Sequence, residues 1–126
     1  MYDLLNNCQW VVLLGVSNNI KPIIRSLNRD YSISPIVYSN TRPFHKFNIF
    51  LKYKFIRQAF PNNNYYTVRS ILDISEFTDG HTCLIVPMTS QFNNIVQESK
   101  DLFENKYIII APSKLIDALP SYRHYA

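Results

Sequence analysis

The apolar segment Trp10–Leu14 ends abruptly at Gly15, and this junction constrains the fold more than any other part of the chain. An apolar set with the i, i+3, i+4 and i+7 spacing of one helix face begins a few residues later and comprises Ile20, Ile23, Ile24 and Leu27. A glycine between a buried strand and a helix permits a sharp turn. Open α/β sheets usually bind their ligands at such a junction.

Four further strand-like segments alternate with helix-like segments along the chain. The strands predicted after the first one are Pro35–Tyr38, Tyr53–Ala59, Thr82–Val86 and Tyr107–Ala111. After the helix that Asn18 or Asn19 would cap, helices are predicted from about residue 62 to 72, from 91 to 105 and from 114 to 119. This alternation predicts a Rossmann-like, three-layer α/β/α fold with a five-stranded, mostly parallel sheet.

The character of the strands predicts their order in the sheet. The first, fourth and fifth are continuous apolar runs, which is typical of strands covered on both faces. The third alternates polar with apolar residues from Lys52 to Phe55, which is typical of a half-exposed edge strand. The order 3-2-1-4-5 accommodates both observations and leaves the fifth strand as an apolar second edge. In that order, the loops Gly15–Asn19 and Pro87–Gln91 follow two neighbouring strands, the first and the fourth, at the topological switch point of the sheet. We refer to these two loops together as the switch.

Length and composition indicate a single globular domain over residues 1–126. Of the 126 residues, 47% are hydrophobic and 17% are charged, so a core can form without disulfides. The two cysteines, Cys8 and Cys83, have no metal-binding spacing and favour a reducing compartment. No apolar run approaches the length of a membrane span, and no basic residue precedes the first apolar run as in a secretory signal. We therefore expect a cytoplasmic protein that does not contact a membrane.

The two loops at the switch carry small neutral polar groups, which suit recognition of a small polar ligand. The candidate substrate-binding residues are Gly15, Ser17, Asn18, Asn19, Thr89, Ser90 and Gln91. The free N–H groups of the helix after Gly15 could bind an anion. A purely structural interpretation stays open, in which Gly15 permits a turn while Asn18 and Thr89 cap helices.

Several kinds of chemistry are disfavoured by missing residues. Only Gly15 remains of a dinucleotide fingerprint, and Ser39-Asn40 stands where an acid would hold the ribose. No phosphate-binding G-x-x-x-x-G-K-[ST] loop and no G-x-S-x-G elbow occurs. The histidines His45, His81 and His124 do not lie near a recognisable nucleophile. We therefore expect no catalytic residue, no metal site and no cofactor within this chain.

The charge is distributed unevenly. No Asp or Glu occurs from Tyr31 to Leu72, a stretch that contains six lysines and arginines interleaved with aromatic residues. This pattern could form a nucleic-acid-binding face. However, Tyr53 and Phe55 share one side of the third strand and are expected to face the core, so that the neighbouring lysines form an ordinary solvated face. This placement disfavours nucleic acid as a partner.

The order of four landmarks along the chain resembles a known family. They are Leu14–Asn19, the segment from Pro43-Phe44 to Tyr53-Lys54-Phe55, Ile85–Gln91, and Ala111–Ser113 followed by Leu115–Asp117 and Ser121–Ala126. Together they resemble the N-terminal, pre-ATP-grasp domain of ATP-grasp carboxylate–amine ligases, a group that includes proteins similar to D-aspartate ligase and carbamoyl-phosphate synthetase.

The resemblance implies that different domains of the enzyme bind the nucleotide and the acceptor substrate. In such enzymes ATP and magnesium bind to later domains, while the loops after the first and fourth strands help to shape the acceptor-substrate pocket. The reaction forms an acylphosphate and couples it to an amine. We would thus expect a small carboxylate or amino-acid substrate, an ATP-grasp domain as partner, and no turnover by residues 1–126 alone. A stand-alone Rossmann-like binding or interaction module without catalysis remains the alternative, and a homodimer stays open.

Overall fold

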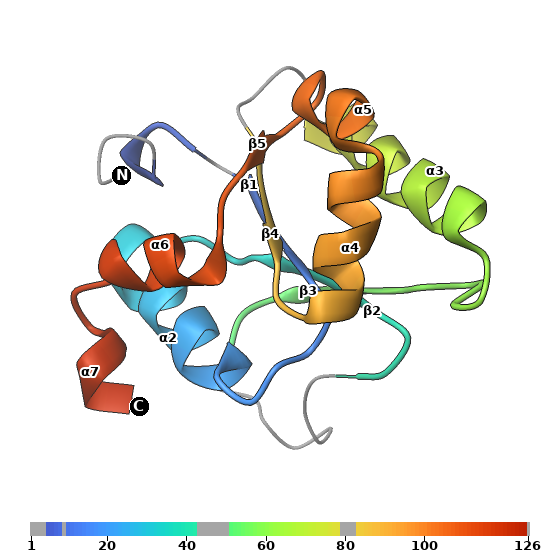
Figure 1. Cartoon of the computed structure of the whole chain (residues 1–126). Helices are drawn as coiled ribbons and strands as arrows, with labels where there is room; N and C mark the ends of the chain where they lie inside the picture. Colours follow the sequence, from blue (N-terminus) through green and yellow to red (C-terminus); the bar gives the residue numbers. More distant parts are fainter. Residues whose placement is uncertain (1–4, 9, 43–50, 79–82, 126) are drawn as a thin grey trace.

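The protein forms a five-stranded parallel sheet with the strand order β3-β2-β1-β4-β5. The computed structural model describes residues 5–8, 10–42, 51–78 and 83–125 (Figure 1). The strands are β1 (Trp10–Leu14), β2 (Ile36–Ser39), β3 (Lys54–Arg57), β4 (Cys83–Pro87) and β5 (Ile108–Ile109). The α/β class, the strand order and the central place of the first strand are therefore confirmed.

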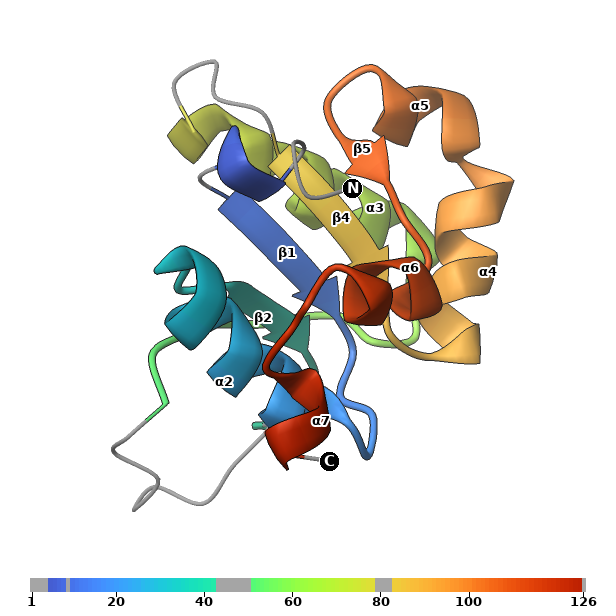
Figure 2. The same cartoon turned by 90° about the vertical axis from the view of Figure 1, so that its left-hand side faces the viewer.

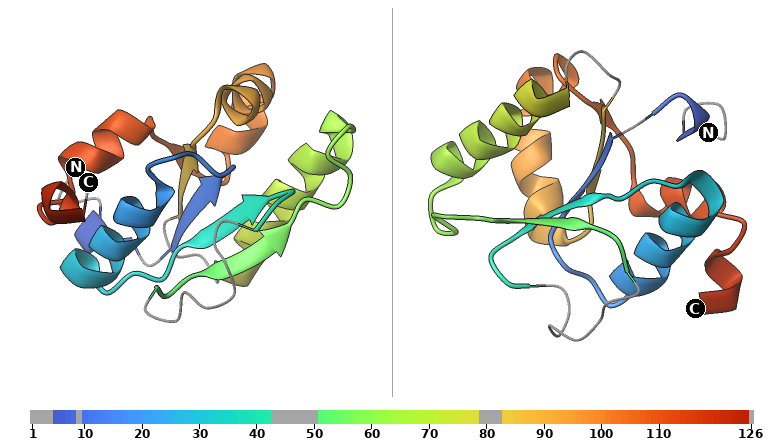
Figure 3. Two further views of the ribbon diagram at one scale, coloured as in Figure 1. Left: turned by 90° about the horizontal axis from the view of Figure 1, so that it is seen from below. Right: turned by 180° about the vertical axis from the view of Figure 1, so that it is seen from behind.

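Helices cover both faces of this sheet and make a three-layer structure (Figure 2; Figure 3). They are α2 (Ile20–Tyr31), α3 (Asn64–Ile74), α4 (Ser90–Glu98), α5 (Lys100–Glu104), α6 (Pro112–Asp117) and α7 (Tyr122–Tyr125), with a 3-10 turn η1 (Ser75–Thr78). Helices α2, α6 and α7 lie on one face, and α3, α4 and α5 lie on the other (Figure 3). No described helix has both the length and the apolarity that a membrane span requires.

The central strand serves two separate cores because its side chains point alternately to opposite faces. Val11 and Leu13 are fully buried in a cluster with residues of α2 and α6. Val12 and Leu14 are equally buried in a second cluster with residues of α3, α4 and α5. A strand buried on both faces must read as a continuous apolar run, which is the pattern of Trp10–Leu14.

The helix predicted from residue 91 to 105 is interrupted. Helix α4 ends at Glu98, and Ser99 adopts φ −121° and ψ 33° before α5 begins. The interruption changes which residues face the sheet, because Phe103 becomes fully buried while Leu102 is 52% exposed. The apolar spacing predicts Leu102 and Phe103 together on the core face of one continuous helix, and this prediction is wrong for Leu102. A serine competes for local backbone hydrogen bonds, which is why it disfavours a helix interior.

The edge strands are shorter than the apolar patterns predicted. The third strand is confined to Lys54–Arg57, and the fifth to Ile108–Ile109. As expected, Tyr53 and Phe55 pack against the core on the α2 side, while Lys52 and Lys54 are exposed. Asp79-Gly80, a sequence typical of a turn that ends the preceding helix, lies outside the described residues. The landmark Pro43-Phe44, the residues His45 and His81, and the side chain of His124 lie outside them as well.

The segment before α7 is tied back to α2. Ser121 donates both its hydroxyl and its backbone N–H to the carboxylate of Asp30, at 2.5 and 3.0 Å. The Tyr31 hydroxyl donates to the carbonyl of Ala118 at 2.7 Å. These bonds fix the last described helix beside α2, opposite the face that carries α4.

The hydroxyl of Tyr38 is buried in the cluster that also contains Val12 and Leu14, and its contribution to stability can be tested. The Tyr38 side chain is 1% exposed, and its ring packs edge-on against Phe92 with centroids 6.0 Å apart. Its hydroxyl lies near Ser70 and Thr67 but makes no well-aligned hydrogen bond with a described residue. We expect Tyr38→Phe to preserve stability or to raise the free energy of unfolding by up to about 1 kcal/mol, because a buried polar group without a partner is removed.

Chemical denaturation of the two proteins measures this difference. Tyr38→Leu serves as the contrast, because it removes the ring as well and should destabilise by about 1–3 kcal/mol. A loss of more than about 1 kcal/mol in Tyr38→Phe would show that the hydroxyl makes a stabilising hydrogen bond after all.

Candidate functional site

The two loops singled out in the sequence leave the sheet from neighbouring strands. Leu14 at the end of β1 pairs with Pro87 at the end of β4. The Met88 N–H donates to the Leu14 carbonyl, and the Gly15 N–H donates to the Tyr38 carbonyl of β2, both at 2.8 Å. From there the chain leads into α2 on one face and into α4 on the other (Figure 2). This is the switch arrangement in which doubly wound sheets bind ligands.

Gly15 brings the two loops into direct contact. Its φ of +91° lies in a region that favours glycine. A Cβ built at this position would come within 2.9 Å of Phe92 Cδ2 and 2.9 Å of Thr89 Cγ2. The backbone of Gly15 is therefore packed against the first turn of α4. Residue identity alone predicted the sharp turn, but it gave no sign of the close approach to Phe92.

In the first loop, the side chains interact with one another before α2 begins. The Ser17 hydroxyl donates to Oδ1 of Asn19 at 2.6 Å. Asn19 occupies the N-cap position of α2, but its side chain makes no capping hydrogen bond. The prediction that Asn18 or Asn19 caps this helix is thus correct in that Asn19 is the N-cap residue. It is wrong in that the Asn19 side chain does not accept a hydrogen bond from the helix backbone. Asn18 itself is exposed to solvent.

In the second loop, Thr89 caps α4. Its hydroxyl accepts a hydrogen bond from the Phe92 N–H at 3.3 Å. The N–H groups of Ser90 and Gln91, at the first two positions of the helix, have no partner within an α-helix. Both of these side chains are exposed. At the start of α4, Thr89 therefore caps the helix while the N–H groups of Ser90 and Gln91 are left to bind water or a ligand.

The switch is chemically neutral, because its loops Gly15–Asn19 and Pro87–Gln91 hold hydroxyl and amide groups but no ionisable side chain. Such groups can orient a ligand by hydrogen bonds, and two helix amino ends favour a ligand with negative charge. They provide neither a general base nor a nucleophile. Within the described ranges, no group of three or more histidine, cysteine or acidic side chains is placed to hold a metal ion.

The described groups with shifted pKa values lie in the core rather than at the switch. Burial raises the pKa of Cys83 to about 11, and it also raises the pKa of Cys8. Burial raises the pKa of Tyr107 as well, whose hydroxyl donates to the Ile71 carbonyl at 2.6 Å. These shifts keep each group protonated at neutral pH, so none of them creates a reactive anion.

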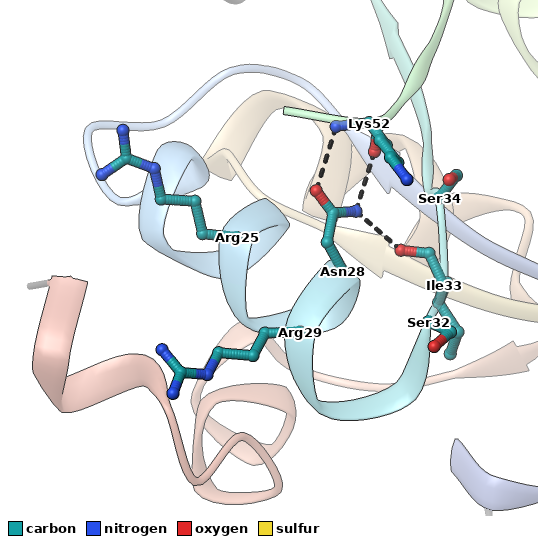
Figure 4. Close-up of a pocket in the computed structure, with 7 residues that line it drawn as sticks. All are labelled: Arg25, Asn28, Arg29, Ser32, Ile33, Ser34 and Lys52. Carbon is teal, nitrogen blue, oxygen red and sulfur yellow. Dashed lines mark hydrogen bonds between the residues drawn. The ribbon is translucent and has the colours of Figure 1, made fainter. Parts of the chain in front are cut away.

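A separate pocket of about 540 Å³ lies at the opposite end of the sheet, near the start of β2 (Figure 4). Arg25, Arg29 and Lys52 line it, but Figure 4 shows the two arginines extending away from Lys52. The side chain of Asn28, which also lines the pocket, is already hydrogen-bonded to the backbone. Its amide N–H groups donate to the carbonyls of Ile33 and Lys52, and its amide oxygen accepts from the Lys52 N–H. These bonds fasten the chain before β3 to α2, a structural role that sequence reasoning missed.

Comparison with protein-family models, with curated proteins and with solved structures gave no match for this chain.

The packing at Gly15 predicts a strong effect of adding one methyl group there. Gly15→Ala should lower the free energy of unfolding by about 2–4 kcal/mol, because it combines a strained φ with overlap against Thr89 and Phe92. Thermal and urea unfolding would measure the change. Asn18→Ala, in the same loop but exposed, is the control and should change stability by less than about 0.5 kcal/mol. Equal stability of Gly15→Ala and Asn18→Ala would contradict the close approach.

The raised pKa of Cys83 predicts slow thiol chemistry. A shift from an ordinary value of 9.0 to about 11 lowers the thiolate fraction at pH 8 by about 100-fold. A Cys8→Ser variant leaves Cys83 as the sole thiol. Its reaction with a disulfide reagent should be at least about 100-fold slower in native protein than in denaturant. Similar rates in both conditions would mean that Cys83 is accessible.

Proposed function

We propose that this chain is the substrate-side domain of an ATP-dependent ligase of the ATP-grasp type, which forms an acylphosphate and couples it to an amine. The observation that carries the proposal is the direct contact of the loops after β1 and β4 through Gly15 and Thr89. In the family that the sequence resembles, the corresponding loops shape the acceptor-substrate pocket. The neutral, hydrogen-bonding character of the two loops supports a binding role without a catalytic one.

The proposed ligand is a small carboxylate or an amino acid. Its carboxylate would be favoured by the N–H groups at the start of α4, next to the exposed side chains of Ser90 and Gln91. From the α2 side, Ser17, Asn18 and Asn19 would contribute hydroxyl and amide groups. ATP and magnesium would be supplied by an ATP-grasp domain in the same protein or in a partner, so residues 1–126 alone are expected to be inactive.

A non-catalytic interaction module is the second candidate, and one observation favours it. The sheet edge formed by β5 exposes 39% of Ile108. A groove of about 510 Å³ runs along this edge and includes Pro87, Asn93 and Gln97. An uncovered apolar edge strand is a template for pairing with another chain. In this alternative β5 would bind a partner, or a second copy, and the switch loops would bind nothing.

Titration of the protein with amino acids and small dicarboxylates, followed by amide chemical shifts in NMR, would test the first proposal. We expect weak, saturable binding with a dissociation constant of about 1–10 mM, with shifts centred on Asn18, Ser90 and Gln91. Ser90→Ala should weaken the binding several-fold through loss of one hydrogen bond. Ser113→Ala is the matched control, since Ser113 is also an exposed serine in the first turn of a helix.

Absence of any shift in the two loops at about 50 mM ligand would refute the substrate-binding role, because millimolar binding would be saturated there. If the only shifts occur at Ile108 and Ile109 and depend on protein concentration, the interaction module is the better description.

A further inference from the structure

Three aromatic side chains are strongly exposed where the chain passes from β3 into α3. Phe60 is 59% exposed, Tyr65 71% and Tyr66 52%. Their rings touch one another, with centroid distances of 5.3 Å between Phe60 and Tyr66 and 5.5 Å between Tyr65 and Tyr66. We refer to these three residues as the aromatic cluster. Large side chains exposed together, unlike scattered ones, commonly mark a binding surface.

The backbone beneath the aromatic cluster is held in place. The Asn63 side chain caps α3 by accepting from the Tyr66 N–H, and the Asn63 N–H donates to the Phe60 carbonyl at 3.0 Å. Gln58, which is buried, donates its side-chain amide to the Thr67 hydroxyl at 3.0 Å. These bonds join the end of β3 to the first turn of α3. The rings therefore project from a preorganised support, which lowers the entropy cost of binding.

Two arginines flank the aromatic cluster along the chain. Arg69 lies three and four residues after the two tyrosines, so it shares their face of α3, and Arg57 lies three residues before Phe60. Both arginines are exposed, and neither forms an ion pair with a residue of the described ranges. The sequence contains no acidic residue between Asp30 and Asp73. Asp73 is the first acid after the aromatic cluster: it lies four residues after Arg69 in α3 and seven residues, or about 10 Å along the helix axis, after Tyr66.

We propose that the aromatic cluster, with Arg57 and Arg69, binds single-stranded nucleic acid by stacking bases on Tyr65, Tyr66 and Phe60. Stacked rings next to cations match unpaired bases joined by phosphates. A protein-docking surface would be expected to include large aliphatic side chains, whereas the exposed residues next to these rings in the sequence are the small Ala59 and the polar Asn62, Asn63 and Asn64. A duplex does not offer its base faces for stacking, so the surface should prefer single strands.

This site is independent of the proposed ligase function. The aromatic cluster lies beyond β3 at one edge of the sheet, whereas the switch lies between β1 and β4. The aromatic cluster lies within the acid-free stretch from Tyr31 to Leu72 noted in the sequence, but it uses other aromatic residues, because Tyr53 and Phe55 pack against the core. The rings that are available for stacking belong to the segment after β3.

Fluorescence anisotropy with labelled twelve-nucleotide oligo(dT) and oligo(U), and with a duplex of equal length, would test this proposal. We expect micromolar binding of the single strands at about 50 mM salt, and much weaker binding of the duplex. Tyr65→Ala and Tyr66→Ala should each weaken the single-strand binding about tenfold. Arg69→Gln should weaken it too, and should reduce the slope of log affinity against log salt by about 0.7.

Matched controls separate this site from general attraction to a basic protein. Phe77→Ala removes a ring that is 69% exposed in η1, after the far end of α3. Lys106→Gln removes an exposed cation just before β5, the strand at the other edge of the sheet from β3. Both should change affinity by less than about twofold. Circular dichroism would verify that every variant is folded.

Three outcomes would overturn the proposal. They are no binding of either single strand below about 100 µM at low salt, equal losses in Phe77→Ala and Tyr65→Ala, and duplex binding as tight as single-strand binding. Self-association that Tyr65→Ala abolishes, in the absence of oligonucleotide binding, would instead assign the aromatic cluster to a protein interface.

Discussion

The contact between Gly15 and the first turn of α4 is the constraint on which the rest of the molecule depends. Because a Cβ at this position would lie 2.9 Å from both Phe92 and Thr89, only a residue without a side chain allows α4 to start so close to β1. Phe92 can then enter the core and meet the ring of Tyr38. The same contact places the loops after β1 and β4 side by side, so the packing of one core and the geometry of the candidate site have a common origin.

The sequence predicted the fold well where the pattern is set by burial on two faces. Apolar runs such as Trp10–Leu14 are typical of strands covered on both faces, and the strand order followed from contrasting them with the alternation around Lys54. The sequence predicted less well where small local preferences decide. The helix breaks at Ser99, where a serine competes for local backbone hydrogen bonds, and Phe103 is then buried while Leu102 is exposed; helical periodicity alone does not predict this break.

The candidate site shows the same division. The two loops and their polar residues could be named in advance, because parallel strands end at one edge of the sheet. The partner of each group could not. Asn19 accepts a hydrogen bond from Ser17 instead of capping α2, while Thr89 both caps α4 and packs against Gly15. The different hydrogen-bond partners open to such a side chain differ in free energy by about 1 kcal/mol. Residue type alone does not predict which partner is chosen at so small a difference.

Charge and exposure distinguish the two surfaces from each other. The loops at the switch are uncharged, so any preference for a carboxylate there must come from helix ends, whose effect is short-ranged. At the aromatic cluster, Arg57 and Arg69 carry full charges within a segment that lacks acids, and the rings stay exposed despite their apolar character. A weakly held, small ligand suits the first surface, and an extended polyanion with stacking bases suits the second. The two surfaces lie at different places along the sheet, because β2 and β3 stand between the aromatic cluster and the strands β1 and β4.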